Sequence, residues 1–383
     1  MDSKLPATGT TIFAVMSGLA AEHDAINLSQ GFPSFNPDQA LLDRVRHHLE
    51  SDHNQYAPMT GIPALREAIR DKVSTLYGRS VSADNEITVC DGATEGLFSV
   101  IQAVVRRGDE VIVFDPAYDS YEPSVTLAGG RTIHLPLVTS ADRPDFHIDW
   151  DQLRDALSDN TRLIIVNFPH NPTGVVLTAE DLDTLADIVR ETDIYLLSDE
   201  VYEHIVFDGA EHQSLLRHDE LWTRTFVVSS FGKTYHATGW KVGYCVAPAV
   251  LTAEFRKIHQ WVCYAVITPV QYALADYMTD TPDHYKALPA FYEEKRDRFC
   301  DLVDASRFTL RPAMGTFFQI LDYSAITDED DVSYAKRLTA EIGVASIPVS
   351  VFCEQPMNDR LLRFCFAKDD DILEAAAERL CQL

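Results

Sequence analysis

The segment SSFGKTYHATGWKVG, residues 229–243, places Lys233 directly after an apolar run, and its amine suits two kinds of chemistry. Gly232-Lys233-Thr234 could end a nucleotide-binding loop, but the first glycine of that loop would fall at Val227. A desolvated lysine in an electropositive site has a lowered pKa, and its neutral amine attacks carbonyl carbons. We therefore predict that Lys233 is a covalent, Schiff-base lysine rather than a phosphate ligand.

Four further side chains suit a pyridoxal phosphate cofactor bound to that lysine, because the ring of this cofactor needs defined partners. Asp199, in SDEVYEH, ends an apolar run, and its carboxylate would keep the pyridine nitrogen protonated. Tyr202 and Asn171 would donate hydrogen bonds to the ring oxygen, and Tyr118 would stack on the ring face. We predict Lys233, Asp199 and Tyr202 as the catalytic residues.

The phosphate of the cofactor also has a predicted site. Ala93 and Thr94 open a predicted helix, and the free backbone N–H groups at a helix start bind anions. Ser230 would add a hydroxyl group and Lys241 a positive charge. These four residues predict a phosphate cup beside Lys233.

Short apolar runs alternate with helical patterns between residues 86 and 250, which is typical of a mostly parallel sheet covered by helices. Ligands of such α/β sheets bind beyond the carboxyl ends of the strands, and the polar clusters of this chain fall there. The predicted strands are Ile87–Cys90, Glu110–Phe114, Arg131–Leu137, Arg162–Asn167, Ile194–Ser198, Phe226–Ser229 and Val242–Val246, and the predicted helices are Thr94–Arg106, Tyr118–Ala128 and Ala179–Arg190.

The two ends of the chain have a different character. Residues 280–383 predict an α+β unit that forms a second domain. The first 40 residues hold the extended stretch AINLSQGFPSFNP, which predicts more arm than core. The elements predicted in the α+β unit are helices at Tyr285–Ser306 and Asp371–Cys381 and strands at Phe317–Leu321, Ser346–Pro348 and Leu361–Phe366.

Composition narrows the class of protein. The formal charge of −27 over 383 residues disfavours nucleic acid and anionic membrane as partners. Seven scattered cysteines without a C-x-x-C pair predict reduced thiols in a cytoplasmic protein. The histidines show no spacing typical of metal ligands, so we expect no metal, and no stretch of ~20 apolar residues predicts a membrane span.

Taken in order, these blocks resemble the class-I aminotransferases of pyridoxal phosphate fold type I. Within that family the chain is similar to the methionine aminotransferase branch, beside kynurenine aminotransferase and glutamine transaminase K. The resemblance covers nearly the whole chain and is carried by TTIFAVMSGLAAEHDAINLSQGFP, NQYAPMTGIPALREAI, FDPAYDSY, HNPTG, SDEVYEH, SSFGKTYHATGWKVGYCVAP and RFCFAK.

The resemblance implies the cofactor roles given above and adds substrate residues. Arg363 matches the arginine that binds the substrate α-carboxylate, and Asn167 and Gly31 match positions beside it. Tyr56 matches a tyrosine that reaches the phosphate of the neighbouring subunit, which implies a homodimer. The family fold implies a large cofactor-binding domain at residues 45–275 and a small domain built from residues 1–44, with the arm, and 276–383.

The resemblance further implies a ping-pong transamination between an amino acid and a 2-oxo acid. Phe13 and Tyr264 are candidate walls for the substrate side chain, which favours methionine, then aromatic or other apolar amino acids. Kynurenine or glutamine transamination and a cysteine-S-conjugate β-lyase stay open, since they share the cofactor residues. A regulator on the same fold is the non-enzyme alternative.

Overall fold

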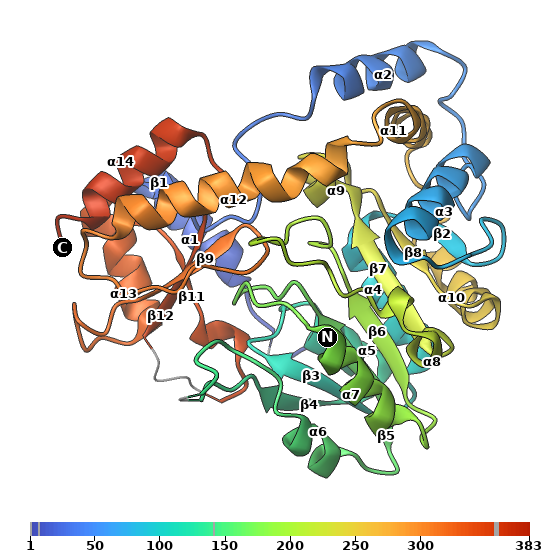
Figure 1. Cartoon of the computed structure of the whole chain (residues 1–383), viewed down its shortest axis with the longest axis horizontal. Coiled ribbons are helices and arrows are strands. Elements are labelled where there is room, and N and C mark those ends of the chain that lie inside the picture. The colour runs from blue at the N-terminus through green and yellow to red at the C-terminus, as the bar shows by residue number, and fades with distance from the viewer. Residues whose placement is uncertain (1, 7, 141, 356–359) are drawn as a thin grey trace.

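The computed structural model describes residues 2–6, 8–140, 142–355 and 360–383, and their larger sheet has seven strands (Figure 1). Its strand order is β2-β8-β7-β6-β5-β3-β4, and every neighbouring pair is parallel except those of β8. The strands are β2 (Ile87–Cys90), β3 (Glu110–Asp115), β4 (Arg131–Pro136), β5 (Thr161–Asn167), β6 (Tyr195–Asp199), β7 (Thr225–Ser230) and β8 (Gly243–Val246). The predicted mostly parallel sheet and its seven strands are confirmed.

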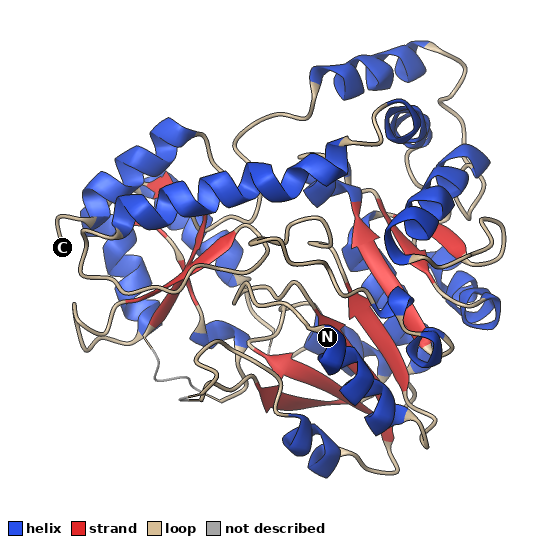
Figure 2. Ribbon diagram, in the orientation of Figure 1, coloured by secondary structure: helices blue, strands red, loops and turns tan. Residues whose placement is uncertain are grey.

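Helices cover both faces of this sheet, which is why its central strands are apolar on both sides. One face packs under α4 (Gly92–Val104), α5 (Tyr121–Ala128) and α10 (Ala249–Val262). The other face packs under two groups of helices, because the sheet is wide and twisted (Figure 2). These are α6 (Trp150–Ala156), α7 (Ala179–Val189) and α8 (Asp219–Trp222), and beside them α3 (Pro63–Tyr77) and α11 (Thr268–Asp280).

The helix predictions hold with one shift that matters for the site. The helix predicted from Tyr118 begins at Tyr121, since the residues before it form a turn closed by the Tyr121 N–H and the Tyr118 carbonyl at 3.2 Å. Helix α7 begins as its sequence suggests, with a reciprocal capping box between Thr178 and Asp181. The short helices α9 (Phe231–Thr234) and 238–240 follow β7 directly.

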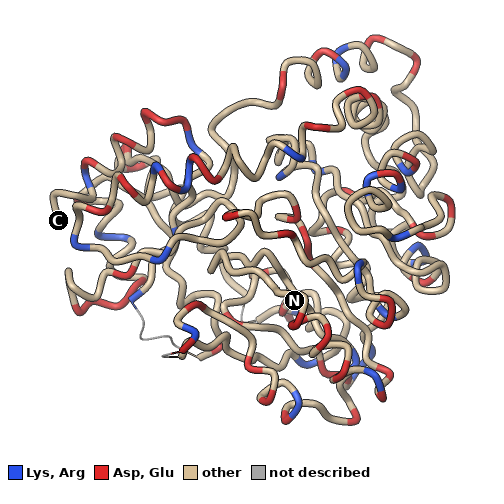
Figure 3. Tube along the Cα trace, viewed as in Figure 1, with Lys and Arg blue, Asp and Glu red and all other residues tan. Residues whose placement is uncertain are grey.

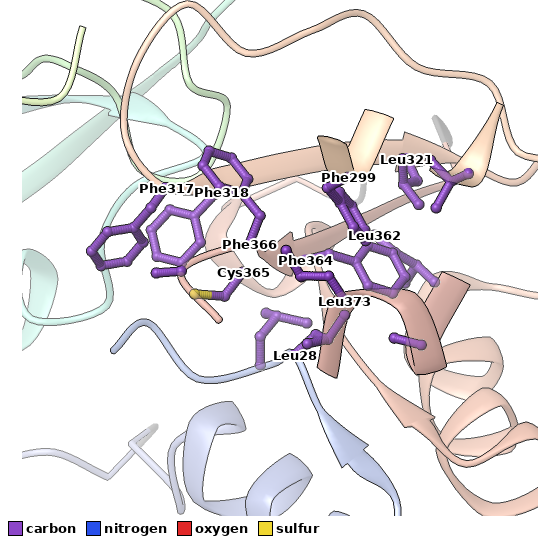
Figure 4. Packing of buried hydrophobic residues seen from close by; sticks show 14 of the residues in the cluster. Leu28, Phe299, Phe317, Phe318, Leu321, Leu362, Phe364, Cys365, Phe366 and Leu373 are labelled. Atoms are coloured by element: carbon purple, nitrogen blue, oxygen red, sulfur yellow. The ribbon is translucent and has the colours of Figure 1, made fainter. Parts of the chain in front are cut away.

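The second region has its own three-stranded antiparallel sheet, in the order β11-β12-β9. Helix α12 (His284–Val303) crosses from the first region to this one, and aromatic side chains from the helix and the sheet form the core between them (Figures 1 and 4). The elements are β9 (Phe318–Asp322), β11 (Ile347–Pro348), β12 (Leu361–Cys365), α13 (Asp331–Arg337) and α14 (Asp370–Leu380). The predicted α+β unit is confirmed.

The stretch predicted to be extended, residues 25–37, contains no helix, but the prediction that the first 40 residues are more arm than core is wrong. Residues Ile12–Glu22 form helix α1, whose Met16 and Ala20 lie one turn apart and are buried in the second core. Strand β1 (Ile26–Asn27) then pairs in parallel with β10 (Val344–Ala345). The chain start is therefore part of the smaller region, held by residues more than 300 positions away.

The exact division between the regions stays a prediction. Helix α2 (Gln39–Glu50) crosses the predicted boundary at 44/45 and packs against α11 of the larger region. Carboxylates are spread over both regions and not gathered on one element (Figure 3). In the described part of the chain, no helix has the length and apolar composition that crossing a bilayer requires.

Candidate active site

A cavity of about 250 Å³ opens where β5, β6 and β7 end, between the two regions. Tyr56 and Tyr264 do not line it, whereas the other thirteen predicted site residues do. These are Phe13, Gly31, Ala93, Thr94, Tyr118, Asn167, Asn171, Asp199, Tyr202, Ser230, Lys233, Lys241 and Arg363.

Strand register explains why residues distant in sequence meet here. Asn167 and Asp199 are the last residues of adjacent parallel strands and lie directly opposite one another. The Asn167 side-chain amide donates to the Asp199 carbonyl at 3.1 Å, which ties the two strand ends together. Strand β7 ends beside them at Ser230, and Lys233 follows within one helical turn.

Lys233 combines burial with positive neighbours. Its Nζ donates to the Gly31 carbonyl at 2.8 Å, and no carboxylate lies within 4.0 Å of it in the described chain. Burial is the main cause that lowers the pKa of Lys233, which falls to about 8. The cations Arg363 and Lys241 act in the same direction, and Cys365 and Asp199 oppose them. A substantial fraction of this amine is therefore neutral, and nucleophilic, near pH 8.

Asp199 is a buried carboxylate held by two donors. The Tyr121 hydroxyl donates to Oδ2 at 2.7 Å, and the Val201 N–H donates to Oδ1 at 3.4 Å. Burial raises the pKa of Asp199 to about 6, and both hydrogen bonds oppose that rise. The group is therefore mostly ionised at pH 7, as a partner for a protonated ring nitrogen must be.

Two glycines shape the turn beneath the predicted phosphate cup. Gly92 has a φ of +74°, which favours glycine. A Cβ at this position would lie 3.1 Å from the Lys241 amine. Because glycine has no Cβ, the amine can reach the start of α4. A Cβ on Gly243 would lie 2.9 Å from the Ala93 nitrogen. The Ser230 hydroxyl, which accepts from the Gly232 N–H at 3.1 Å, completes this concave group of donors. Such a cradle at a helix start fits a phosphate.

Arg363 is a buried cation without a carboxylate partner in the described chain. It is 1% exposed, its Nη1 donates to Asn171 Oδ1 at 2.8 Å, and its Nη2 donates to the Ser29 carbonyl at 2.9 Å. Its Nε has no hydrogen-bond partner, and its guanidinium lies 3.9 Å from the centre of the Phe318 ring. Burial lowers the pKa of Arg363 to about 10. An anion in the cavity would form a charge-assisted hydrogen bond with this guanidinium.

Aromatic rings line the remaining walls. Tyr118 stands edge-on to Tyr121, with ring centroids 5.6 Å apart. Tyr202 lies beside Lys233, whose amine is 5.7 Å from the centre of its ring. Phe13, near the start of α1, has the Arg363 guanidinium 5.3 Å from its centroid. The cavity therefore has a polar floor at the strand ends and apolar sides.

Tyr56 and Tyr264 lie together on the surface, away from the cavity of their own chain. Their exposed fractions are 82% and 58%, and their rings meet edge to face at 5.3 Å. Tyr264 has a positive φ of 64°, a left-handed backbone conformation that is uncommon for a residue other than glycine. Neither residue contributes to this site within one chain.

Several residues at the site were not predicted from the sequence, and three of them make contacts with predicted residues. Tyr121 bonds Asp199, Phe318 stacks on Arg363, and Gln30 lines the cavity while its amide donates to the Phe13 carbonyl at 2.9 Å. The signal for Tyr121 was its place one helical turn after Tyr118 in FDPAYDSY. No sequence pattern points to the other two.

One cluster of potential metal ligands occurs in the described part of the chain: Cys90, Glu95 and His259 lie with ligand atoms within 4.8 Å of each other. Both ring nitrogens of His259 already have partners, Glu95 at 3.0 Å and the Met59 carbonyl at 3.0 Å. The cluster is thus a satisfied hydrogen-bond network in which His259 holds Glu95, a residue in the first turn of α4.

The donor groups of the cavity fit pyridoxal phosphate. The cradle at α4 suits its phosphate, Asp199 its ring nitrogen, and the amine of Lys233 its aldehyde. The unpaired Nε of Arg363 is left for a further anion, such as a substrate carboxylate.

Comparison with known proteins shows which family the chain is similar to. The family model described as aminotransferase class I and II matches residues 23–380. Methionine aminotransferase of Escherichia coli is 52% identical over 100% of this chain and 98% of its own length. A solved Escherichia coli structure with a methionine aminotransferase function superposes with a TM-score of 0.97, and the match covers 100% of this chain and 99% of that chain. The structure of N-succinyldiaminopimelate aminotransferase from Mycobacterium tuberculosis is 36% identical, with a TM-score of 0.95 over 100% and 99%. A kynurenine–oxoglutarate transaminase of Dictyostelium discoideum is 34% identical over 98% and 94%.

Proposed function

The chain belongs to the class I and II aminotransferases, and from this premise we propose that it transfers the amino group of methionine to a 2-oxo acid with pyridoxal phosphate as cofactor. The observation that carries the proposal is the set of cations in the cavity. Among its described lining residues three are cationic, Lys233, Lys241 and Arg363. Two serve the cofactor and one the substrate α-carboxylate, so no cation is left for a second carboxylate. An uncharged side chain such as that of methionine, the substrate named for the Escherichia coli relative, suits the apolar walls.

The residues of the chain divide the work between binding and proton transfer. Pyridoxal phosphate, when bound, supplies the electron sink that stabilises negative charge at the substrate α-carbon. Arg363 binds the α-carboxylate through its guanidinium, and Asn171 and the Ser29 carbonyl hold that guanidinium in place. Lys233 Nζ takes the proton from the α-carbon, for which its lowered pKa of about 8 is suited. The donor leaves as a 2-oxo acid before the acceptor binds at Arg363, which makes the reaction ping-pong.

A panel of amino donors tests the substrate proposal. With the purified cofactor-loaded enzyme and a fixed 2-oxo acid, we expect kcat/KM for methionine to exceed that for aspartate by roughly 100-fold. The reason is that a second carboxylate would be buried against Phe13 and Phe318 without a cation. Aspartate as the best donor, with methionine unused, would refute the proposal. Release of pyruvate and ammonia from a cysteine S-conjugate without any 2-oxo acid would assign the enzyme as a β-lyase.

We also propose a homodimer in which Tyr56 reaches the phosphate of the partner's cofactor. Support comes from exposed aromatic side chains: Tyr56 is 82%, Trp261 84% and Tyr264 58% exposed, which is unusual for a surface without a partner. Tyr56 also lines a shallow groove together with the exposed Ile267. Tyr264 would then wall the partner's cavity instead of its own.

Mixed dimers test this arrangement. Tyr56→Ala weakens cofactor binding and Lys233→Ala removes the reactive amine, so each homodimer should be inactive at a cofactor concentration that just saturates the wild type. Co-expressed and randomly paired, the two variants should recover about one quarter of wild-type turnover, since half the dimers are hybrids with one complete site each. Recovery at the level of the separate variants would exclude a shared site.

We propose that the enzyme acts in the cytoplasm. Cys90, Cys245 and Cys365 are buried thiols that form no disulfide, in keeping with a reducing compartment. The net charge of −27 supports small molecules rather than nucleic acid or anionic membranes as its partners.

A further inference from the structure

The Asp199 carboxylate depends on one side chain for its short hydrogen bond. The Tyr121 hydroxyl donates to Oδ2 at 2.7 Å, whereas the Val201 N–H lies 3.4 Å from Oδ1, and no cation lies within 4.0 Å of either oxygen in the described chain. Asp199 and Tyr121 are each 3% exposed, so water does not replace the hydroxyl. A buried carboxylate that loses its main donor raises the free energy of the folded protein, and its side chain becomes free to rotate.

Tyr121 is held rigidly where this bond requires it. It is the first residue of α5, its N–H donates to the Tyr118 carbonyl at 3.2 Å, and its ring packs edge-on against the ring of Tyr118. The α5 helix is tied to α4 by the Gln102 amide, which donates to the Ser124 carbonyl at 2.8 Å. One turn of chain thus carries both the ring that is to stack on the cofactor and the hydroxyl that binds its acid partner.

The hydroxyl acts only as a donor. Burial raises the pKa of Tyr121 well above its ordinary value, and the negative charge of Asp199 raises it further, so the phenol keeps its proton at any working pH. A charge-assisted hydrogen bond of this kind favours the ionised carboxylate over the neutral acid. It also fixes Oδ2, so that Oδ1, which accepts only the longer bond from the Val201 N–H, is the oxygen left to face a ligand.

We propose that Tyr121 is a positioning residue that keeps Asp199 ionised and aims its Oδ1 at the ring nitrogen of pyridoxal phosphate. The inference rests on the proposed function. It makes the strength of pyridoxal phosphate binding by Asp199 depend on Tyr121, a residue that does not itself line the cavity.

The test is Tyr121→Phe, which keeps the ring and removes the hydroxyl. Tyr292→Phe is the matched control, because Tyr292 is a buried tyrosine whose hydroxyl has no partner. The readout is the dissociation constant of pyridoxal phosphate from the apo-protein, measured by fluorescence between pH 5 and 8. We expect Tyr121→Phe to weaken binding roughly tenfold at pH 7, and Tyr292→Phe to leave it within twofold.

The pH profile separates positioning from a loss of packing. Without its donor, Asp199 takes up a proton at higher pH, so the acid-side loss of binding should begin about one pH unit higher in Tyr121→Phe than in the wild type. In an Asp199→Asn background the same substitution should no longer move the profile, because no carboxylate remains to titrate. An unchanged profile in Tyr121→Phe, or an equal shift in the Asp199→Asn background, would overturn the proposal. Failure of the wild type to bind pyridoxal phosphate at all would instead refute the proposed function.

Discussion

Lys233→Ala is expected to lower the turnover of methionine by at least ~10³-fold, the scale of a lost proton-transfer group. The second amine among the described lining residues, that of Lys241, does not replace it, because it lies at the start of α4 beside Gly92, in the proposed phosphate cup. The reaction is followed in a single turnover, with cofactor-loaded enzyme, methionine and no acceptor, by the change in cofactor absorbance.

Lys257→Ala is the control for this experiment. Lys257 lies on α10, its side chain is 65% exposed, and its one ion pair joins Glu254 at 2.6 Å on the same helix. Exposed pairs of this kind contribute little, so turnover should stay at the wild-type level. Circular dichroism checks that both variants are folded. Turnover of Lys233→Ala within tenfold of the wild type would remove Lys233 from the mechanism.

Arg363→Lys is expected to lower kcat/KM for methionine by roughly 100-fold, mainly through KM. A lysine cannot make the two parallel hydrogen bonds that a guanidinium makes to a carboxylate, and it would leave the Asn171 amide oxygen and the Ser29 carbonyl without their donors. Initial rates over a range of methionine concentrations give the two constants separately.

Two controls isolate the carboxylate contact. Arg296 is equally buried but pairs with Asp208 through two hydrogen bonds of 2.7 and 2.9 Å outside the cavity, so Arg296→Lys should lower thermal stability and leave KM unchanged. The amine that corresponds to methionine without its carboxylate should react slowly and equally with wild type and Arg363→Lys. If Arg363→Lys slowed that amine as strongly as methionine, the arginine would serve the fold and not the α-carboxylate.

The larger sheet and its site were predictable because each depends on local sequence. Buried parallel strands are continuous apolar runs, and the residue after each run, such as Asp199, must lie at the sheet edge where ligands bind. Lys233 was predictable for the same reason, since it follows β7 within one turn. The family resemblance added Arg363, whose role no local pattern reveals.

The parts that were missed depend on distant or external partners. Helix α1 is stabilised by packing on elements near residues 338–348, which a reading of the first 40 residues does not contain. The bond from Tyr121 to Asp199 requires α5 to begin at Tyr121, three residues after the predicted start. Tyr264 lies on the surface of its own chain, and only the proposed second subunit would bring it to a cavity.

The claim on which the account depends is that the Lys233 amine carries the cofactor. Borohydride reduction of the enzyme loaded with pyridoxal phosphate, followed by protease digestion and mass spectrometry, locates the modified lysine directly. We expect one reduced-cofactor adduct per chain, on the peptide that contains Lys233, and none on Lys241. An adduct on another lysine, with Lys233 unmodified, would contradict it.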